Sequence, residues 1–303
     1  MPAAIALLSA LLFGTGDFLS GLAARRAGLK RTMLVTQAAG LVLLLAAAPL
    51  ASSAAPTAAD LAWGALAGLC GALGLSALYR GLAEGLAAVV APVSALVAAL
   101  LPVLFGAILG ERPSATALVG GALCIPAIVL LSWEGGGQAE GGRAKASLAV
   151  GALAGLFLGV FYVAISRTSG GSGLWPLVAA RSAALAAIAV AAALGLPLLA
   201  GAPAGSGDAT PAKPGPARGP ARGPGLLLRH WPALAGGAFD ASANIAFLVA
   251  SRSGLLMIVS VVSSLYPAPT VLLARVFFKQ RIGPARAAGL VLALAGVALV
   301  AAR

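Results

Sequence analysis

Long apolar runs alternate with short polar segments along the whole chain. A bilayer core of about 30 Å needs roughly 20 apolar residues in a helix, and ten runs come close to that length. They cover residues 3–24, 32–50, 58–79, 86–109, 115–133, 147–166, 174–199, 231–250, 255–278 and 284–301. The pattern therefore predicts an all-α membrane protein of about ten transmembrane helices.

Two polar segments interrupt this pattern. Residues 134–146 are rich in Gly and predict a linker between a first unit, 1–133, and a second unit, 147–303. Residues 201–225 are a basic, low-complexity stretch of Pro and Gly, which is typical of a disordered loop. Neither segment holds the Gly-Lys-Ser/Thr sequence whose backbone cradles nucleotide phosphates, so we expect no attached ATPase domain.

The tryptophans and glycines support these spans. Every Trp falls near the end of a predicted helix, as aromatic belts at the membrane interface do. These residues are Trp63, Trp133, Trp175 and Trp231. Small residues at three- and four-residue spacing, from Gly64 to Gly74, predict that the third span packs closely against a neighbour.

The two units are similar in sequence. A shift of 169 residues, which takes Gly85 to Gly254 and Arg112 to Arg281, overlays the third to fifth spans on the eighth to tenth without a gap. Because each unit has five helices, the second must insert upside down relative to the first. Two inverted five-helix repeats are typical of secondary transporters, which bind their solute between the halves near the midplane.

The distribution of Lys and Arg among the loops predicts the orientation of the chain in the membrane. Alternate loops, including those around Arg25 to Arg31 and Lys213 to Arg229, hold 14 Lys and Arg residues, and the opposite set with the C-terminus holds four. The positive-inside rule then puts both termini outside the cytoplasm. The location that fits is the plasma (inner) membrane, as a multi-pass protein in contact with the lipid bilayer.

Composition excludes several other classes. The chain is 60% hydrophobic and 9% charged, whereas soluble domains have roughly 25% charged residues. Its net charge of +12 lies in the loops rather than on a basic face with aromatics, so we expect no nucleic-acid partner. One His and two Cys leave no ligand set for a catalytic metal, and we expect no cofactor and no enzyme activity.

Three segments resemble the EamA-type transporters of the drug/metabolite transporter superfamily. LLFGTGDFLSGLAARR (11–26) is similar to the first helix of that family, APVSALVAALLPVLFGAILGERPS (91–114) to its fourth helix, and SSLYPAPTVLLARVFFKQR (263–281) to the partner segment of the second half. The resemblance implies ten helices in two repeats and transport of a small metabolite. Lys279-Gln280-Arg281 departs from the Gly-Glu-Arg of the family, and many members keep both termini in the cytoplasm.

Two acids lie within the apolar runs. An ionisable residue inside a membrane is costly and marks a functional hypothesis. Asp17 and Asp240 lie roughly 12 and 13 Å from the same basic side by helical rise, and Asn244 shares the face of Asp240 one turn on. Both acids are candidates for binding solute or carrying a proton. The alternative is a structural role, in which hydrogen bonds to neighbours fix the packing.

Other polar residues complete the candidate set. Arg181 lies where the resemblance places an Arg of the second half, and Gln37 occupies the corresponding place in the first. Arg181 would pair with an acid or an anionic group, or else extend towards the interface. Tyr79, Tyr162 and Tyr266 would line a cavity, or else belong to the interfacial belt.

The function that fits these residues is secondary transport without ATP. The expected solute is a small metabolite, an amino acid or an organic cation, moved by alternating access. Transport would be either coupled to protons or facilitative. The alternative is a membrane channel, or a structural membrane subunit without transport coupling.

Overall fold

The chain is all-α. A computed structural model describes residues 1–51, 54–83, 87–132, 141–194, 225–278 and 283–301, and side chains at a few helix ends in these ranges are not described. Within them lie helices α1 (Pro2–Ala27), α2 (Leu29–Ala51), α3 (Ala58–Ala83), α4 (Ala87–Ile108), α5 (Ala115–Ser132), α6 (Gly141–Ser166), α7 (Trp175–Ala193), α8 (Gly225–Ser253), α9 (Leu256–Ser263), α10 (Pro267–Phe278) and α11 (Pro284–Ala301).

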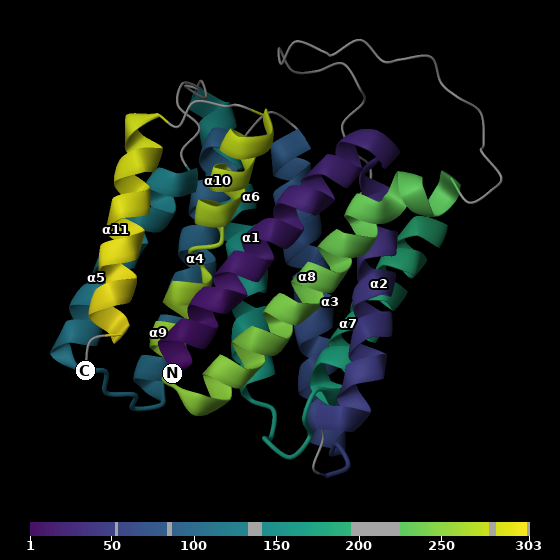
Figure 1. Cartoon of the computed structure of the whole chain (residues 1–303), viewed down its shortest axis with the longest axis horizontal. Coiled ribbons are helices and arrows are strands. Elements are labelled where there is room, and N and C mark those ends of the chain that lie inside the picture. The colour runs from purple at the N-terminus through teal and green to yellow at the C-terminus, as the bar shows by residue number, and fades with distance from the viewer. Residues whose placement is uncertain (52–53, 84–86, 133–140, 195–224, 279–282, 302–303) are drawn as a thin grey trace.

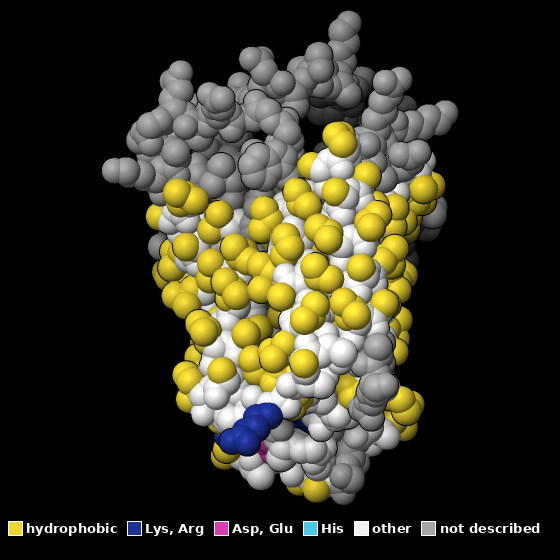
Figure 2. Space-filling model, turned by 90° about the vertical axis from the view of Figure 1, so that its left-hand side faces the viewer, with side chains coloured by type: hydrophobic (Ala, Val, Ile, Leu, Met, Phe, Trp, Pro, Cys, Tyr) yellow, Lys and Arg dark blue, Asp and Glu magenta, His cyan; other side chains and the backbone are white. Residues whose placement is uncertain are grey.

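The composition of the helices makes this a membrane protein. In the described ranges, six are long and apolar enough to cross a bilayer, namely the greater part of α1, α2, α3, α6, α7 and α8. Shorter apolar helices occupy parts of α4, α5 and α11 and the region of α9 and α10. Hydrophobic side chains cover most of the described part of the face formed by α5 and α11, and basic and acidic side chains are visible at its lower edge (Figure 2). Ile108, Val291 and Leu294 are each more than two-thirds exposed, which suits contact with lipid rather than water.

The helices pack in a regular pattern (Figure 1). α1 packs against α8, and α3 packs against both α6 and α7. α2 contacts α7 and α8, α4 contacts α6, and α5 pairs with α11 at one edge of the bundle. α1 begins and α11 ends at the same end of the bundle, and α2 begins at the opposite end.

Glycines set the closest helix contacts. A Cβ atom on Gly64 or Gly68 would meet the backbone of α7 at Pro176 or Ala180, and one on Gly74 would lie 3.0 Å from a carbonyl oxygen of α6. Only residues without a Cβ allow backbones to approach this closely. The predicted packing role of these glycines in the third span is therefore confirmed.

The predicted span 255–278 is not one helix. It divides into α9 and α10, with a turn over Ser264–Tyr266 between them. Pro267 causes the break, because it has no amide hydrogen and its ring disfavours a helical residue before it. At 1.5 Å per residue, α9 and α10 are about 12 and 18 Å long. Each crosses roughly half of a bilayer, and Tyr266 lies between them.

Helix boundaries also differ at two polar segments. α6 begins at Gly141, inside the predicted linker, and α8 begins at Gly225, six residues before the predicted span. Trp63, Trp175 and Trp231 lie in the first two turns of α3, α7 and α8 as predicted. Trp133 and nearly all of the predicted disordered loop, 201–224, lie outside the described residues.

Candidate functional site

Asp17 and Asp240 lie at the same level on adjoining helices. A Cβ atom on Gly16 would be 3.2 Å from the backbone nitrogen of Asp240 and 3.2 Å from the carbonyl oxygen of Gly236. α1 and α8 are in direct contact here because both present small residues. The sequence prediction that the two acids share a depth is confirmed.

Asp240 is paired with Arg181. A guanidinium nitrogen of Arg181, on α7, forms an ion pair with Oδ2 of Asp240, and its Nη1 donates to Oε1 of Gln37 on α2. The Arg181 side chain is 12% exposed and Asp240 is 32% exposed, so the cation is the more deeply held partner. Of the alternatives for Arg181, the structure shows the pairing and not an extension to the interface. Gln37 and Arg181, predicted as equivalent positions, contact one another.

Asn244 extends this arrangement along α8. Its Nδ2 donates to the carbonyl oxygen of Asp240 at 2.7 Å and lies 3.4 Å from Oδ2. Its Oδ1 is buried and has no hydrogen-bond partner in the described part of the chain. Gln37, Arg181, Asp240 and Asn244 are called the Arg181 network below.

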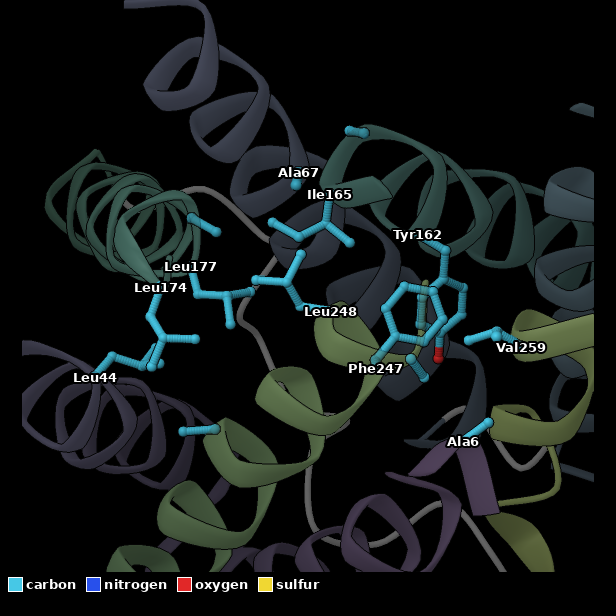
Figure 3. Packing of buried hydrophobic residues seen from close by; sticks show 14 of the residues in the cluster. Ala6, Leu44, Ala67, Tyr162, Ile165, Leu174, Leu177, Phe247, Leu248 and Val259 are labelled. Atoms are coloured by element: carbon cyan, nitrogen blue, oxygen red, sulfur yellow. The ribbon is translucent and has the colours of Figure 1, made fainter. Parts of the chain in front are cut away.

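Asp17 has different surroundings. None of the described groups donates a hydrogen bond to its carboxylate or pairs with its charge. Tyr162 is 7% exposed and belongs to the core, with its ring 4.5 Å from that of Phe247 (Figure 3). The belt alternative for Tyr162 is therefore wrong. The side chain of Tyr79 lies outside the described residues.

The break between α9 and α10 holds Tyr266 beside α1. Thr270 Oγ1 donates to the carbonyl oxygen of Gly14 at 2.9 Å, and a Cβ atom on Gly14 would meet the carbonyl oxygen of Tyr266. Ser264, two residues before Tyr266, has a buried hydroxyl without a partner in the described ranges. Asp17, Tyr162 and Tyr266 thus come from α1, α6 and the α9–α10 break.

A second acidic site escaped the sequence analysis. Asp60, at the start of α3, accepts hydrogen bonds from the backbone and hydroxyl of Thr57 at 3.1 and 2.9 Å, and from those of Ser169 at 2.7 and 2.9 Å. Thr57 and Asp60 have the spacing of a capping box, with Asp in place of Glu or Gln. This spacing is the feature of the sequence that predicts a structural role for Asp60.

Arg252 holds the other side of the same loop. Its Nη1 donates to the carbonyl oxygen of Gly173 at 2.8 Å, and its Nη2 donates to the hydroxyls of Thr168 and Ser172 at 3.0 and 3.3 Å. The loop between α6 and α7 is therefore fixed to α3 by Asp60 and to α8 by Arg252. These residues and Thr57 and Ser169 form the Asp60 cluster.

Glu111 was also missed. Its carboxylate accepts hydrogen bonds from the backbone nitrogens of Leu256 and Met257 at 2.8 and 2.9 Å, so it caps the N-terminus of α9. The turn before it needs Gly110, whose φ of 77° lies in the left-handed region that favours glycine. The partners are 145 and 146 residues apart in the chain, which no local pattern predicts.

Two other features do not define a site. An open apolar pocket of about 590 Å³ is lined by Leu61, Trp175 and Val178 among others, near the start of α3. It offers no charged group for recognition. Among the described residues, no three His, Cys, Asp or Glu side chains gather as a metal site requires.

Comparison with known proteins identifies the fold. No protein-family model matches the chain, and no curated protein matches its sequence. Solved structures do match. One of them, described only as a crystal structure of a protein, aligns over 98% of this chain and 95% of the other, with a TM-score of 0.63 and 20% identity. At that identity the likeness shows a shared fold and carries no function.

Proposed function

We propose that the chain is a secondary transporter of the EamA type, with ten membrane spans in two inverted five-helix repeats, 1–133 and 147–303. α1 to α5 then correspond to α6, α7, α8, the broken pair α9 and α10, and α11. It would move a small metabolite, amino acid or organic cation across the plasma (inner) membrane by alternating access.

The pairing of the helices supports the two repeats. Under this correspondence the contact of α1 with α8 is the counterpart of α6 with α3, and α2 with α8 is the counterpart of α7 with α3. α2 with α7 and α5 with α11 pair equivalent helices. A two-fold axis in the membrane plane generates this set of contacts, as in inverted-repeat transporters.

The observation that carries the proposal is the polar layer between the repeats. Gln37 and Asp17 come from the first repeat, and Arg181 and Asp240 from the second. Charged groups in a membrane interior are expensive and are found where an interior pathway needs them. A layer contributed by both repeats is where alternating access requires a solute to bind.

Counterflow in proteoliposomes tests the proposal. Vesicles loaded with one unlabelled solute receive the same solute in radiolabelled form, and the set covers organic cations, amino acids and uncharged metabolites. A carrier accumulates label transiently above equilibrium, whereas a channel only equilibrates it. Protein-free vesicles and the exposed-residue variant Lys30→Gln serve as controls. Equilibration without overshoot for every solute would contradict the proposal and favour the channel.

The proposed orientation has its own test. Both termini would face away from the cytoplasm, because Lys30 and Arg31 lie at the opposite end of the bundle. After replacement of the two buried cysteines, Cys70 and Cys124, single cysteines at Lys30 and Gly170 mark the two ends. An impermeant maleimide should label Gly170→Cys in intact cells and spare Lys30→Cys. The reverse pattern would overturn the orientation.

A further inference from the structure

We propose that Asp240 and Asn244 form a binding site for an uncharged solute that donates hydrogen bonds from an N–H group, as a primary amide does. The inference rests on the proposed function, because a solute site between two repeats has a purpose only in a transporter. It names the chemical class of the solute and the two side chains that recognise it.

Asn244 offers a hydrogen-bond acceptor that the protein does not use. Its side chain is buried, with 5% of the residue exposed, and its Oδ1 has no partner in the described part of the chain. The contacts of Nδ2 fix which amide atom is the oxygen, because Nδ2 lies 2.7 Å from the carbonyl oxygen of Asp240 and 3.4 Å from its Oδ2. A buried acceptor without a donor is costly, so Oδ1 favours a ligand that brings a hydrogen-bond donor.

Asp240 supplies a second acceptor close to the first. It lies near the middle of α8, yet its side chain is 32% exposed. A carboxylate that faces lipid is strongly unfavourable, so this exposure fits an interior space that a solute can enter. From the dimensions of an amide, Asn244 Oδ1 lies at most about 6 Å from Asp240 Oδ2. One NH2 group, or two neighbouring N–H groups, can bridge oxygens at such a separation.

The ion pair of Asp240 with Arg181 favours a solute without charge. The two side chains neutralise one another, and Arg181 also donates to Gln37. A Cβ atom on Gly40 would lie 3.4 Å from Nε of Arg181, so the guanidinium is enclosed beside α2. An ammonium group at Asp240 would add a second cation next to Arg181, and a carboxylate would have to displace Asp240. Both changes are costly in a medium of low dielectric constant, whereas an uncharged donor leaves the ion pair intact.

The site adjoins helices of the first repeat. A Cβ atom on Gly237 would meet the backbone of Thr36, so α2 touches α8 one turn before Asp240. On α1, the hydroxyl of Ser9 donates to the carbonyl oxygen of Ala243 at 2.9 Å. Asn244 Oδ1 is covered by protein in this conformation. A solute would therefore reach it when α1 and α2 move relative to α8, as alternating access between the repeats requires.

Binding by the full-length protein in lipid nanodiscs tests the chemistry of the site. Equilibrium dialysis of radiolabelled probes, with protein-free nanodiscs as the blank, compares benzamide with methyl benzoate, benzoate and benzylammonium. A smaller set compares propionamide with methyl propionate, propionate and n-propylammonium. In at least one set the amide should bind about fivefold more tightly than the ester, which lacks the N–H donors, and more tightly than both ions. Equal binding of amide and ester, preference for an ion, or no binding in either set would overturn the proposal.

Variants locate the acceptor. Asn244→Leu has a similar size and removes Oδ1, so the ratio of amide to ester affinity should fall to about one. Ser9→Ala is the matched control, because it removes a buried hydroxyl that already has a partner on α8, and it should keep the wild-type ratio. If Asn244 only supported the packing of α8, its loss would change stability and leave the ratio unchanged. An unchanged ratio in Asn244→Leu, or in Asn244→Ala if the Leu variant does not fold, would contradict the assignment.

Counterflow of the amides separates this inference from the proposed function. Amide binding that depends on Asn244, without counterflow of any solute, would support the site and contradict the transporter. Counterflow of other solutes by a protein that does not distinguish amide from ester would support the transporter and overturn the site.

Discussion

Asp60 and Asp17 are both acids on helices of the same bundle, but their surroundings are opposite. Asp60 accepts four hydrogen bonds, two from Thr57 and two from Ser169. Asp17 accepts none from the described residues. Asp60 is 3% exposed and joins the start of α3 to the loop after α6, whereas Asp17 follows Gly16 at the contact of α1 with α8.

The difference separates a structural acid from a candidate for solute or proton binding. A carboxylate whose lone pairs are all used by its own chain fixes that chain and has no capacity for a ligand. A carboxylate without partners is costly inside a membrane and keeps its acceptors for a solute or a proton. Asp240 lies between these cases, because Arg181 pairs with its charge and Asn244 donates one further hydrogen bond to its Oδ2.

The largest effect on the free energy of unfolding is expected when Asp240 loses its ion-pair partner Arg181. Arg181→Leu leaves Asp240 unpaired in the membrane and should lower the free energy of unfolding by about 3–5 kcal/mol. The double variant Arg181→Leu with Asp240→Leu should recover much of that loss. Reversible unfolding in mixed micelles measures both, and additive losses in the double variant would show that the two side chains do not act as a pair.

Removal of the structural acid should have the next largest effect. Asp60→Ala leaves the amides of Thr57 and Ser169 without an acceptor and should cost about 2–3 kcal/mol of unfolding free energy. Ser169→Ala removes only one hydroxyl donor and should cost about 1 kcal/mol. Equal stability of Asp60→Ala and the wild type in mixed micelles would refute the structural role of Asp60.

Removal of the Glu111 carboxylate should have a smaller effect on the free energy of unfolding than removal of Asp60. Glu111→Ala removes the cap of α9 and should cost about 1–2 kcal/mol, and Glu111→Gln should recover part of it because the amide oxygen still accepts a hydrogen bond. Hydrogen exchange at the amides of Leu256 and Met257 reports the cap directly. Protection of those two amides should fall in Glu111→Ala, and unchanged protection would contradict the capping role.

Asp17 should have the smallest effect on stability. Asp17→Asn removes a charge that no described group compensates, so the free energy of unfolding should stay within about 0.5 kcal/mol or rise slightly. A loss comparable to that of Asp60→Ala in the same micelles would mean that Asp17 is a structural acid after all.

The sequence predicted the parts of this account that depend on local patterns. Apolar runs located the helices, and the rise of an α-helix placed Asp17 and Asp240 at one depth. Pro267 was a visible signal for the break between α9 and α10, but the apolar run continued across it and was interpreted as one span. Thr57 and Asp60 likewise carried a capping signal that was overlooked.

The sequence did not predict which polar groups form ion pairs or hydrogen bonds with each acid. Arg181 is 59 residues from Asp240, and Glu111 is 145 residues from Leu256. Such pairs depend on which helices become neighbours, and that depends on the packing of the whole bundle. From the sequence both acids were binding candidates, and Asn244 one turn away favoured Asp240, whereas the structure pairs Asp240 with Arg181.

Counterflow by Asp17→Asn and Asp60→Asn, measured on the same preparations used for unfolding, tests the central claim most directly. We predict that Asp17→Asn keeps its stability and loses counterflow of the transported solute. Asp60→Asn should lose stability and keep counterflow per folded molecule. Wild-type counterflow by Asp17→Asn, in vesicles that contain the same amount of folded protein, would contradict the account.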